Sequence, residues 1–181
     1  ESMAPIVPGS FNLTGDGGDP ERRAGVRTTT SLFATIGLAP LLGRTFAPDD
    51  GTSEAVAVVS EGFWSRHLGG DPAAVGRTIT LDGSPHVVVG VVPRDFRFPS
   101  GEIDVFVPTT WAPDVLAQEN SYFWYLVAKL RAGASIEAAR AEMAAISTAL
   151  SAESPARGLP ATIEPLRETL ARGAGPIADV V

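Results

Sequence analysis

The residues of this chain that could carry out chemistry are few, and their spacing argues against a catalytic centre. Its 181 residues include two histidines, His67 and His86, and no cysteine. Two histidines this far apart form no metal-binding motif, and without cysteine there is no thiol nucleophile, disulfide or zinc–thiolate site. We expect His67 to be packed or to lie at the rim of a predicted helix. His86 opens a predicted strand and should lie at the surface.

Two adjacent carboxylates, Asp49 and Asp50, are the other candidate, either for a metal site or for a hydrolase. Adjacent aspartates point in different directions, and no histidine or further ligand is near them in the sequence, so we predict a solvated turn. The Gly-Asp-Gly-Gly-Asp-Pro run at 15–20 lacks the spaced acidic ligands and final glutamate of an EF-hand and is also predicted to be a turn. The sequence therefore predicts no catalytic, cofactor-binding or metal-binding residue, and no cofactor.

Nucleotides and nucleic acids are also poor candidates for ligands. The chain has neither a Gly-x-x-x-x-Gly-Lys loop nor a Gly-x-Gly-x-x-Gly loop after a strand, so we expect that it does not bind or hydrolyse ATP. A net charge of −7 and the lack of a basic run argue against nucleic acid and against docking on an anionic membrane face. No apolar run reaches the length of a membrane span, and no signal peptide is recognisable. By itself this pattern would favour the cytoplasm.

The element that carries His67 is a short predicted helix. Ser60 is a suitable N-cap, Phe63, Trp64 and His67 fall on one face, and the glycine pair at 69–70 ends the helix. We expect Trp64 to be largely buried beneath neighbouring strands.

The rest of the chain alternates between strands, short helices and turns. Residues 1–9 are predicted to be loose, and 22–29 to be an exposed or edge strand. The other predicted strands are 55–59, which should be central, 78–81 and 86–92 around an Asp-Gly turn, 103–107, which should be half-buried, 122–130, the longest, and 161–166. Further helices are predicted at 31–36, with a single turn after Asp71, and at 167–172.

Residues 135–150 form the clearest predicted helix. Ser135 caps it, and an apolar stripe follows at helical spacing, formed by Ile136, Ala139, Met143, Ile146 and Leu150. With the strands predicted on either side, this helix makes a split βαβ unit, which is half of a ferredoxin-like sheet.

The remaining candidates are arginines and tryptophans. Arg44 and Arg77 occur in two Gly-Arg-Thr triplets and are expected to tie loops down through carboxylates or carbonyls. Trp124 should pack in the core. Trp111 lies in an irregular stretch and is the tryptophan most expected to be exposed.

Several runs of the sequence together resemble a known family. They are LGRTF at 42–46, VVSEGFWSRHLGGDPAAVGRTITLDG at 58–83, VVGVVPRDFRFP at 88–99 and YLVAKLRAGASIEAARAEM at 125–143. In this order, over roughly residues 9–170, they resemble the MacB-like periplasmic core domain. This is the large extracytoplasmic segment of MacB-type ABC-transporter permeases, relatives of macrolide exporters, lipoprotein-release permeases and FtsX-like proteins.

The resemblance implies an α+β chain of two lobes. A porter-like lobe with the split βαβ unit would comprise 1–31 and 119–181 and would lack its first strand and helix, which lie upstream in the family. An inserted small mixed α/β lobe would comprise 32–118. The implied function is non-catalytic: the domain would transmit ATP-driven conformational change, or contact substrate or an adaptor protein for export.

The resemblance also implies partners and a location. The partners would be a cytoplasmic ABC ATPase domain or subunit, a periplasmic adaptor protein and a second permease copy. The domain would lie on the periplasmic side of a bacterial inner membrane, joined to it by flanking helices outside this chain.

Two other functions stay open. In an FtsX-like permease, the domain would be a protein-binding module that regulates cell-wall hydrolases, and it would bind a hydrolase without moving a substrate. A hydrolytic enzyme would instead need a deep pocket lined by Asp49 or Asp50.

Overall fold

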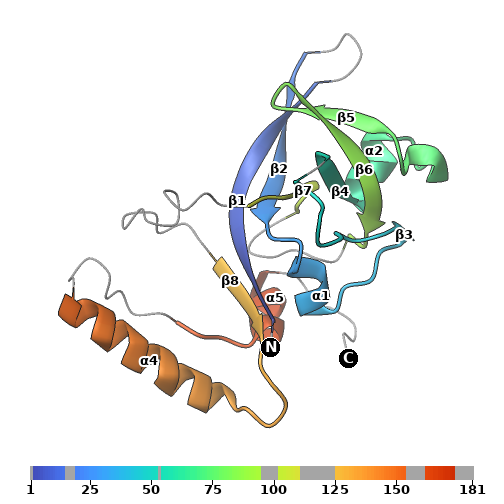
Figure 1. The fold of residues 1–181 in the computed structure, drawn as a ribbon. Coiled ribbons are helices and arrows are strands. Elements are labelled where there is room, and N and C mark those ends of the chain that lie inside the picture. Colours follow the sequence, from blue (N-terminus) through green and yellow to red (C-terminus); the bar gives the residue numbers. More distant parts are fainter. Residues whose placement is uncertain are drawn as a thin grey trace.

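The computed structural model describes residues 2–14, 19–52, 54–94, 102–110, 125–153 and 162–173. Figure 1 shows curved strands gathered at one end of the molecule, with two helices, α4 and α5, at the other. The strands are β1 (Ser2–Thr14), β2 (Glu21–Thr28), β3 (Leu42–Gly43), β4 (Val56–Ser60), β5 (Thr78–Leu81), β6 (Ser84–Val92), β7 (Val105–Pro108) and β8 (Tyr125–Lys129). The helices are α1 (Leu32–Ile36), α2 (Glu61–His67), the 3₁₀ turn η1 (Pro72–Ala74), α4 (Ile136–Glu153) and α5 (Leu166–Gly173).

Six of the strands pair in a closed ring. Their order is β1-β2-β7-β4-β6-β5 and back to β1, with parallel pairing between β2 and β7 and between β4 and β6. A closed ring has no edge strand. Two strands lie outside the ring: the two-residue β3 pairs with β6, and β8 pairs with β1 alone among the described strands. The predicted α+β class is confirmed, since a mixed sheet carries a few short helices and one long one.

The 13-residue strand β1 connects the ring to β8. Its first part, Ser2–Ile6, pairs with β8, and its second part, from Ile6 onward, pairs with β2 and finally with β5. The prediction that residues 1–9 are loose is therefore wrong. Pro5 and Pro8 suggested a loop, but proline fits extended backbone wherever its nitrogen is not needed as a donor, and long-range pairing overrides the local signal.

Alternate residues of the central strands face two hydrophobic clusters. Val58 and Phe106 belong to one cluster, and Val59 and Val105 belong to the other. β4 is central, as predicted, and is buried along its whole length. Two other predictions are wrong: β7 is fully buried rather than half-buried, and β2 is not an edge strand, because β1 and β7 lie on either side of it.

The caps predicted at Ser60 and Asp71, and the turns predicted after α2 and around Asp82-Gly83, are confirmed. The Ser60 hydroxyl accepts a hydrogen bond from the Phe63 amide (3.2 Å), and the Asp71 carboxylate accepts one from the Ala73 amide (2.8 Å). α2 is followed by glycines at 69 and 70, both with positive φ. In the turn between β5 and β6, Asp82 and Gly83 also have positive φ (49° and 79°), which matches the twist of a tight hairpin.

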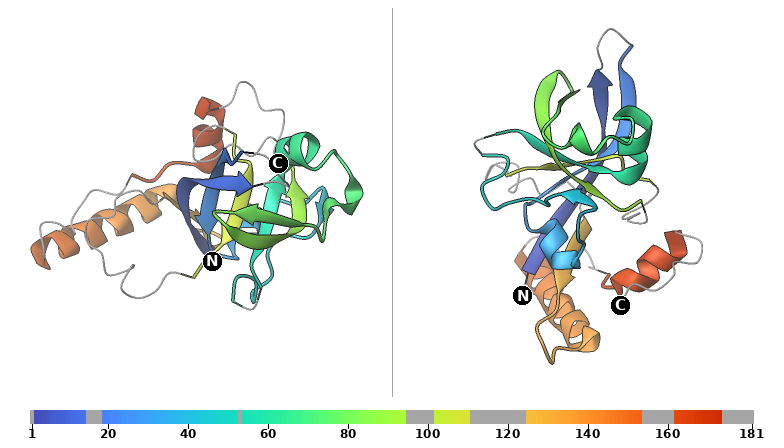
Figure 2. Two further views of the ribbon diagram at one scale, coloured as in Figure 1. Left: turned by 90° about the horizontal axis from the view of Figure 1, so that it is seen from above. Right: turned by 90° about the vertical axis from the view of Figure 1, so that its right-hand side faces the viewer.

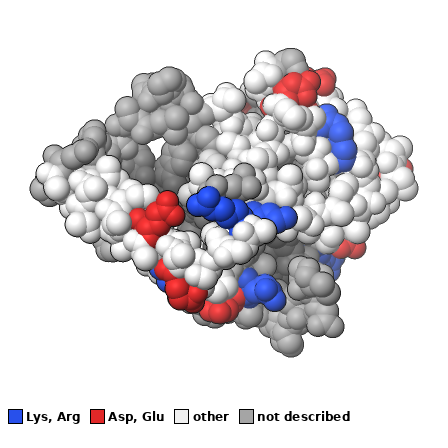
Figure 3. Space-filling model, turned by 60° about the horizontal axis from the view of Figure 1, so that its bottom comes forward, with Lys and Arg blue, Asp and Glu red and all other residues white. Residues whose placement is uncertain are grey.

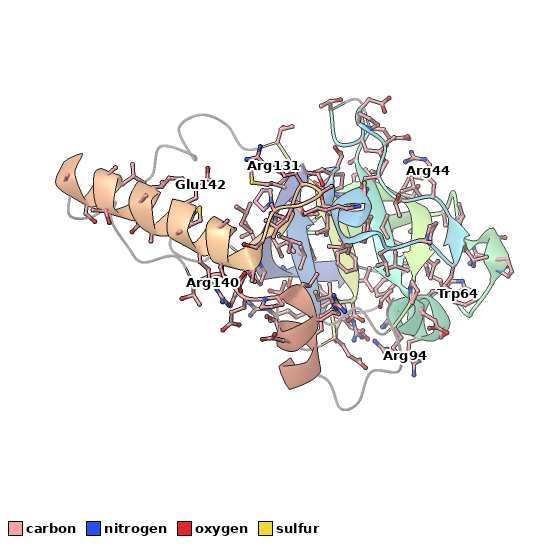
Figure 4. All side chains as sticks on the ribbon, turned by 90° about the horizontal axis from the view of Figure 1, so that it is seen from below. Arg44, Trp64, Arg94, Arg131, Arg140 and Glu142 are labelled. Atoms are coloured by element: carbon pink, nitrogen blue, oxygen red, sulfur yellow. The ribbon has the colours of Figure 1, made fainter. Side chains whose placement is uncertain are left out.

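Trp64 is partly buried and packs against the second cluster, so its predicted burial beneath the strands is met only in part. Its neighbour Phe63 is 0% exposed and fills the second cluster, while Trp64 packs at the rim and its indole Nε1 donates to the Asp71 carbonyl (2.9 Å). Figure 4 shows Trp64 beside α2 at the outer edge of the molecule. Because α2 has only seven residues, its contact with the ring is narrow and is centred on Phe63.

The C-terminal part of the chain begins as predicted but ends differently. Ser135 caps α4 by accepting a hydrogen bond from the Ala138 amide (3.1 Å), and α5 confirms the predicted final helix. β8 is shorter than β1, and residues 162–165 form no strand, so the longest strand and the last strand were wrongly predicted. A strand needs a neighbour to pair with, and no described strand lies beside 162–165. Of the predicted split βαβ unit, the described residues contain the first strand (β8) and the helix (α4) but no second strand.

One sheet joins residues from both predicted lobes, because β1 pairs with β5 as well as with β8. The division at 31/32 and 118/119 therefore stays a prediction. Trp111, Trp124 and the predicted turn at 15–18 lie outside the described residues, as does the stretch at 111–124.

Candidate functional site

The carboxylate pair at 49–50 is a structural contact. Asp50, with a side chain 7% exposed, accepts hydrogen bonds from both terminal nitrogens of Arg44 (2.6 and 3.0 Å) and from the Ala47 amide (2.7 Å). The Arg44 guanidinium holds the pKa of Asp50 below its usual range. The predicted solvated turn is thus wrong for Asp50, whose oxygens are committed to closing the loop before β4.

Both arginines singled out in the sequence tie loops down, as predicted. Arg44 also donates to the Thr45 carbonyl (3.1 Å), and Arg77 forms an ion pair with Asp71 next to η1. Within the described residues, no group of three histidines, aspartates or glutamates is placed to hold a metal ion.

The two histidines lie on different elements. His86 is on β6, with its Nδ1 3.0 Å from the Ser84 carbonyl oxygen. His67 is on α2 and stacks on Phe63, with ring centroids 4.8 Å apart. Its packed position confirms the prediction from helix spacing.

Strands β1 and β8 carry large apolar side chains that are exposed to solvent. Met3 and Leu126 are 56% and 59% exposed, and Leu130, just after β8, is 42% exposed. Opposite residues of antiparallel strands share a face, and the register sets Met3 against Ala128. We call Met3, Leu126, Ala128 and Leu130 the open face. On the other side of the same ribbon, Ala4, Ile6 and Val127 are buried in the first cluster.

Helix α4 has an apolar stripe that is also poorly covered. Ile146 is 44% exposed and Leu150 36% exposed, although the stripe has the spacing of a buried helix face. Figure 1 and the left view of Figure 2 show α4 running away from the strands. One contact places its first half: Arg140 Nε donates to the Ile163 carbonyl (3.0 Å). In Figure 4, Arg140 lies on the side of α4 that faces this segment.

Three features of the described residues therefore meet at one end of the molecule. They are the open face, the stripe on α4, and the extended segments β8 and 162–165, which have no further described strand beside them. Figure 3 shows the lower side, where charged side chains of both signs lie in separate patches between wide uncharged areas. Contiguous exposed apolar surface on a soluble domain marks an interaction site.

Sequence reasoning missed the open face because alternation along the predicted strand at 122–130 separates two faces without showing which of them meets a core. The structure buries Val127, on the face opposite Leu126, Ala128 and Leu130. One feature of the sequence could have indicated the open face. The amphipathic helix predicted at 135–150 needs a second layer to cover its apolar stripe, and no second long amphipathic helix is predicted in this chain.

Comparison with known proteins identifies the fold. Residues 1–146 match the family described as the MacB-like periplasmic core domain. The periplasmic region of MacB from Actinobacillus actinomycetemcomitans superposes with a TM-score of 0.63 at 16% identity, over 84% of this chain and 68% of that one. A domain of a putative permease from Porphyromonas gingivalis gives a TM-score of 0.60 at 17% identity, over 82% and 70%.

A third solved structure has a similar fold. The extracellular domain of the noncanonic ABC-type transporter YknZ from Gram-positive bacteria superposes with a TM-score of 0.59 at 14% identity, over 86% of this chain and 76% of that one. No curated protein sequence matches. None of the helices in the described ranges is long and apolar enough to cross a membrane. The match over 146 residues shows that the chain belongs to the MacB-like periplasmic core domain family of ABC permeases.

Proposed function

We propose that this domain is a non-catalytic coupling element of a MacB/FtsX-type ABC permease, which carries ATP-driven motion to the far side of the membrane or presents a contact for substrate or an adaptor protein. The observation that carries the proposal is the junction between a closed strand ring and the open face. The ring is densely packed and able to move as one body, whereas the open face has the exposed apolar side chains of a surface that is covered in the whole protein.

The open face fits completion by a strand and a helix of the same polypeptide. A strand beside β8 would reach 162–165 on its other side, and a helix crossing back over the sheet would cover Leu126, Leu130 and the stripe on α4. The solved relatives are longer than the matched part, which spans 68–76% of each. In this proposal residues 1–31 and 119–181 belong to the porter-like lobe, and 32–118 to the inserted lobe.

The family supplies the remaining partners of the proposal. A cytoplasmic ATPase domain or subunit would provide the energy, and flanking helices would anchor the domain at the inner membrane. An adaptor protein and a second permease copy are further partners. These partners would contact the outer surface of the strand ring. The ring lies at the end of the molecule away from α5 and the start of β1.

A disulfide lock in the complete permease tests the coupling. Thr14 of β1 and Thr80 of β5 face each other in a ladder of only two residue pairs, and they lie in different proposed lobes. Ser2 and Lys129 also face each other across antiparallel strands, on the side of the ribbon away from the open face, but lie within one proposed lobe. Directly opposed residues have Cα atoms about 4.5–5.5 Å apart, which is within disulfide range. The chain has no native cysteine to compete.

The Thr14→Cys/Thr80→Cys permease should lose transport when oxidised and regain it with reductant. The Ser2→Cys/Lys129→Cys permease should transport normally in both states. Full transport by the first variant, with its crosslink verified by mass spectrometry, would contradict motion between the lobes. Loss of transport in both variants would show that the oxidation itself is harmful and would remove the support for coupling.

A further inference from the structure

His67 is on the side of helix α2 that lines a pocket together with Glu21, the first residue of β2, and it lies near Arg23 of β2 and Asp104 of the segment before β7. Its ring lies against Phe63. Its Nε2 is buried and has no hydrogen-bond partner in the part of the chain that the structure describes. The same is true of Nε of Arg23 on β2. An unpaired buried nitrogen is uncommon in native proteins and calls for an explanation.

The charged groups around this ring favour its neutral form. Arg23, paired with Glu21, faces it from β2. Arg66 adjoins it on α2 and is bonded to Asp104 (2.8 Å), with Glu102 3.9 Å away, both from the segment before β7.

Asp19 and Glu21 lie at the rim of the shallow pocket beside the ring, which is also lined by Leu68 and Ile79. Burial lowers the pKa of His67 below its usual value, Arg23 and Arg66 lower it further, and Asp104 opposes them.

We propose that His67 is an acid-sensitive latch that holds α2 on the strand ring while its imidazole is neutral. A protonated ring would carry a buried N–H at Nε2 with no acceptor, close to two guanidinium groups. The Asp104 carboxylate that could compensate is already bonded to Arg66. Protonation therefore favours conformations in which α2 has moved off the strand ring. The packing of Phe63 in the second cluster loosens with it.

The direction of the pH effect follows from linkage. A histidine whose pKa is lower in the packed state binds its proton more readily once α2 is released. The packing of α2 is then fully stabilised above the ordinary histidine pKa of about 6.5 and weakens as the pH falls below it. This inference concerns the chain itself, so it stands or falls independently of the coupling role.

Amide hydrogen exchange on the isolated chain tests the latch. The amides of Leu68 and Gly70, both bonded to the Trp64 carbonyl (3.0 and 3.1 Å), report on α2. The Leu38 amide, bonded to the Phe33 carbonyl (3.0 Å), reports on α1 in the same sample. Their ratio cancels the intrinsic pH dependence of exchange. Between pH 7.5 and 5.5 the exchange of α2 relative to α1 should accelerate, by at most about tenfold per pH unit for one proton.

The second histidine provides a matched control. His86→Gln should keep the acceleration of the wild type, and His67→Gln should lose it. A wild-type ratio that does not change with pH, or the same acceleration in His67→Gln, would overturn the proposal. If His67→Gln fails to fold, NMR titration of the His67 imidazole in the wild type decides: its midpoint must lie below the ordinary histidine value of about 6.5, and a midpoint at or above that value would refute the latch.

Discussion

Truncating the two neighbouring aromatic residues of α2 should have clearly different consequences. Phe63 is fully buried among Val59, Ile79 and other side chains of the second cluster. Phe63→Ala removes a buried ring and leaves a cavity, so it should cost about 3–5 kcal/mol of unfolding free energy. Trp64 is only partly buried at the rim of that cluster, and its truncation loses part of a ring contact and one hydrogen bond, from its indole Nε1 to the Asp71 carbonyl. We expect Trp64→Ala to cost about 1–2.5 kcal/mol.

Urea unfolding of the isolated chain, with tryptophan fluorescence and far-UV circular dichroism followed together, measures both values. Coincident transitions would support a two-state analysis, and an unchanged slope would assign a shift in midpoint to stability. Trp64→Phe separates the contributions of Trp64: it keeps most of the apolar contact and loses the Nε1 donor, so it should cost about 0.5–1.5 kcal/mol. If Trp64→Ala proves as costly as Phe63→Ala, α2 presents a different face to the ring from the one described.

Three further predictions concern the loop before β4, nucleotide binding and the open face. Asp50→Asn should cost about 1–3 kcal/mol, because three hydrogen bonds to a buried carboxylate are weakened, while Asp49→Asn should be neutral in the same melts. Since the pKa of Asp50 is lowered in the folded state, its stabilisation is present above the unfolded-state pKa of about 4 and is lost as the pH falls; the wild type should therefore lose more stability than Asp50→Asn between pH 5 and 3. The isolated chain should show no saturable ATP binding by calorimetry, and a measurable affinity would contradict the reading of its loops. Leu126→Ser should change stability by less than about 0.5 kcal/mol, against about 1–3 kcal/mol for Val127→Ala, yet Leu126→Ser should impair the complete permease; equal costs in the isolated chain would mean that the open face is covered.

The sequence predicted the local structure correctly wherever a few neighbouring residues decide the backbone conformation. The Ser60 cap, the glycine pair after α2, the Asp71-Pro72 turn and the Asp82-Gly83 hairpin all depend on backbone preferences within four or five residues. The sequence predicted that Arg44 and Arg77 bind loop carboxylates or carbonyls, because a guanidinium in such a loop has few other roles. It did not predict which residues they bind. Asp50 was expected in solvent, since nothing in the sequence shows that the loop folds back over Arg44.

Pairing between strands far apart in the chain could not be predicted from the sequence. The errors in β1, β2 and the open face all have this cause. β2 was predicted to be an edge strand because its parallel partner β7 lies almost 80 residues further along the chain. The prolines at the start of β1 indicated a loop, since the strands that hold β1 extended come from elsewhere. The candidate surface was missed for the same reason. Alternation predicts two faces for a strand but does not say which one meets a core.

The arrangement of β1 suggests how one chain combines a stable body with an incomplete surface. The second half of β1 belongs to the ring, where every strand has two neighbours and the core is dense. Its first half leaves the ring and carries β8, so a displacement of β8 is transmitted along a continuous backbone rather than across a loop. The exposed side chains lie on this first half and on the elements after β8, where added chain would pack without disturbing the ring. A force applied at the open face would therefore move the ring as one body, unless the two-pair contact between β1 and β5 gives way first.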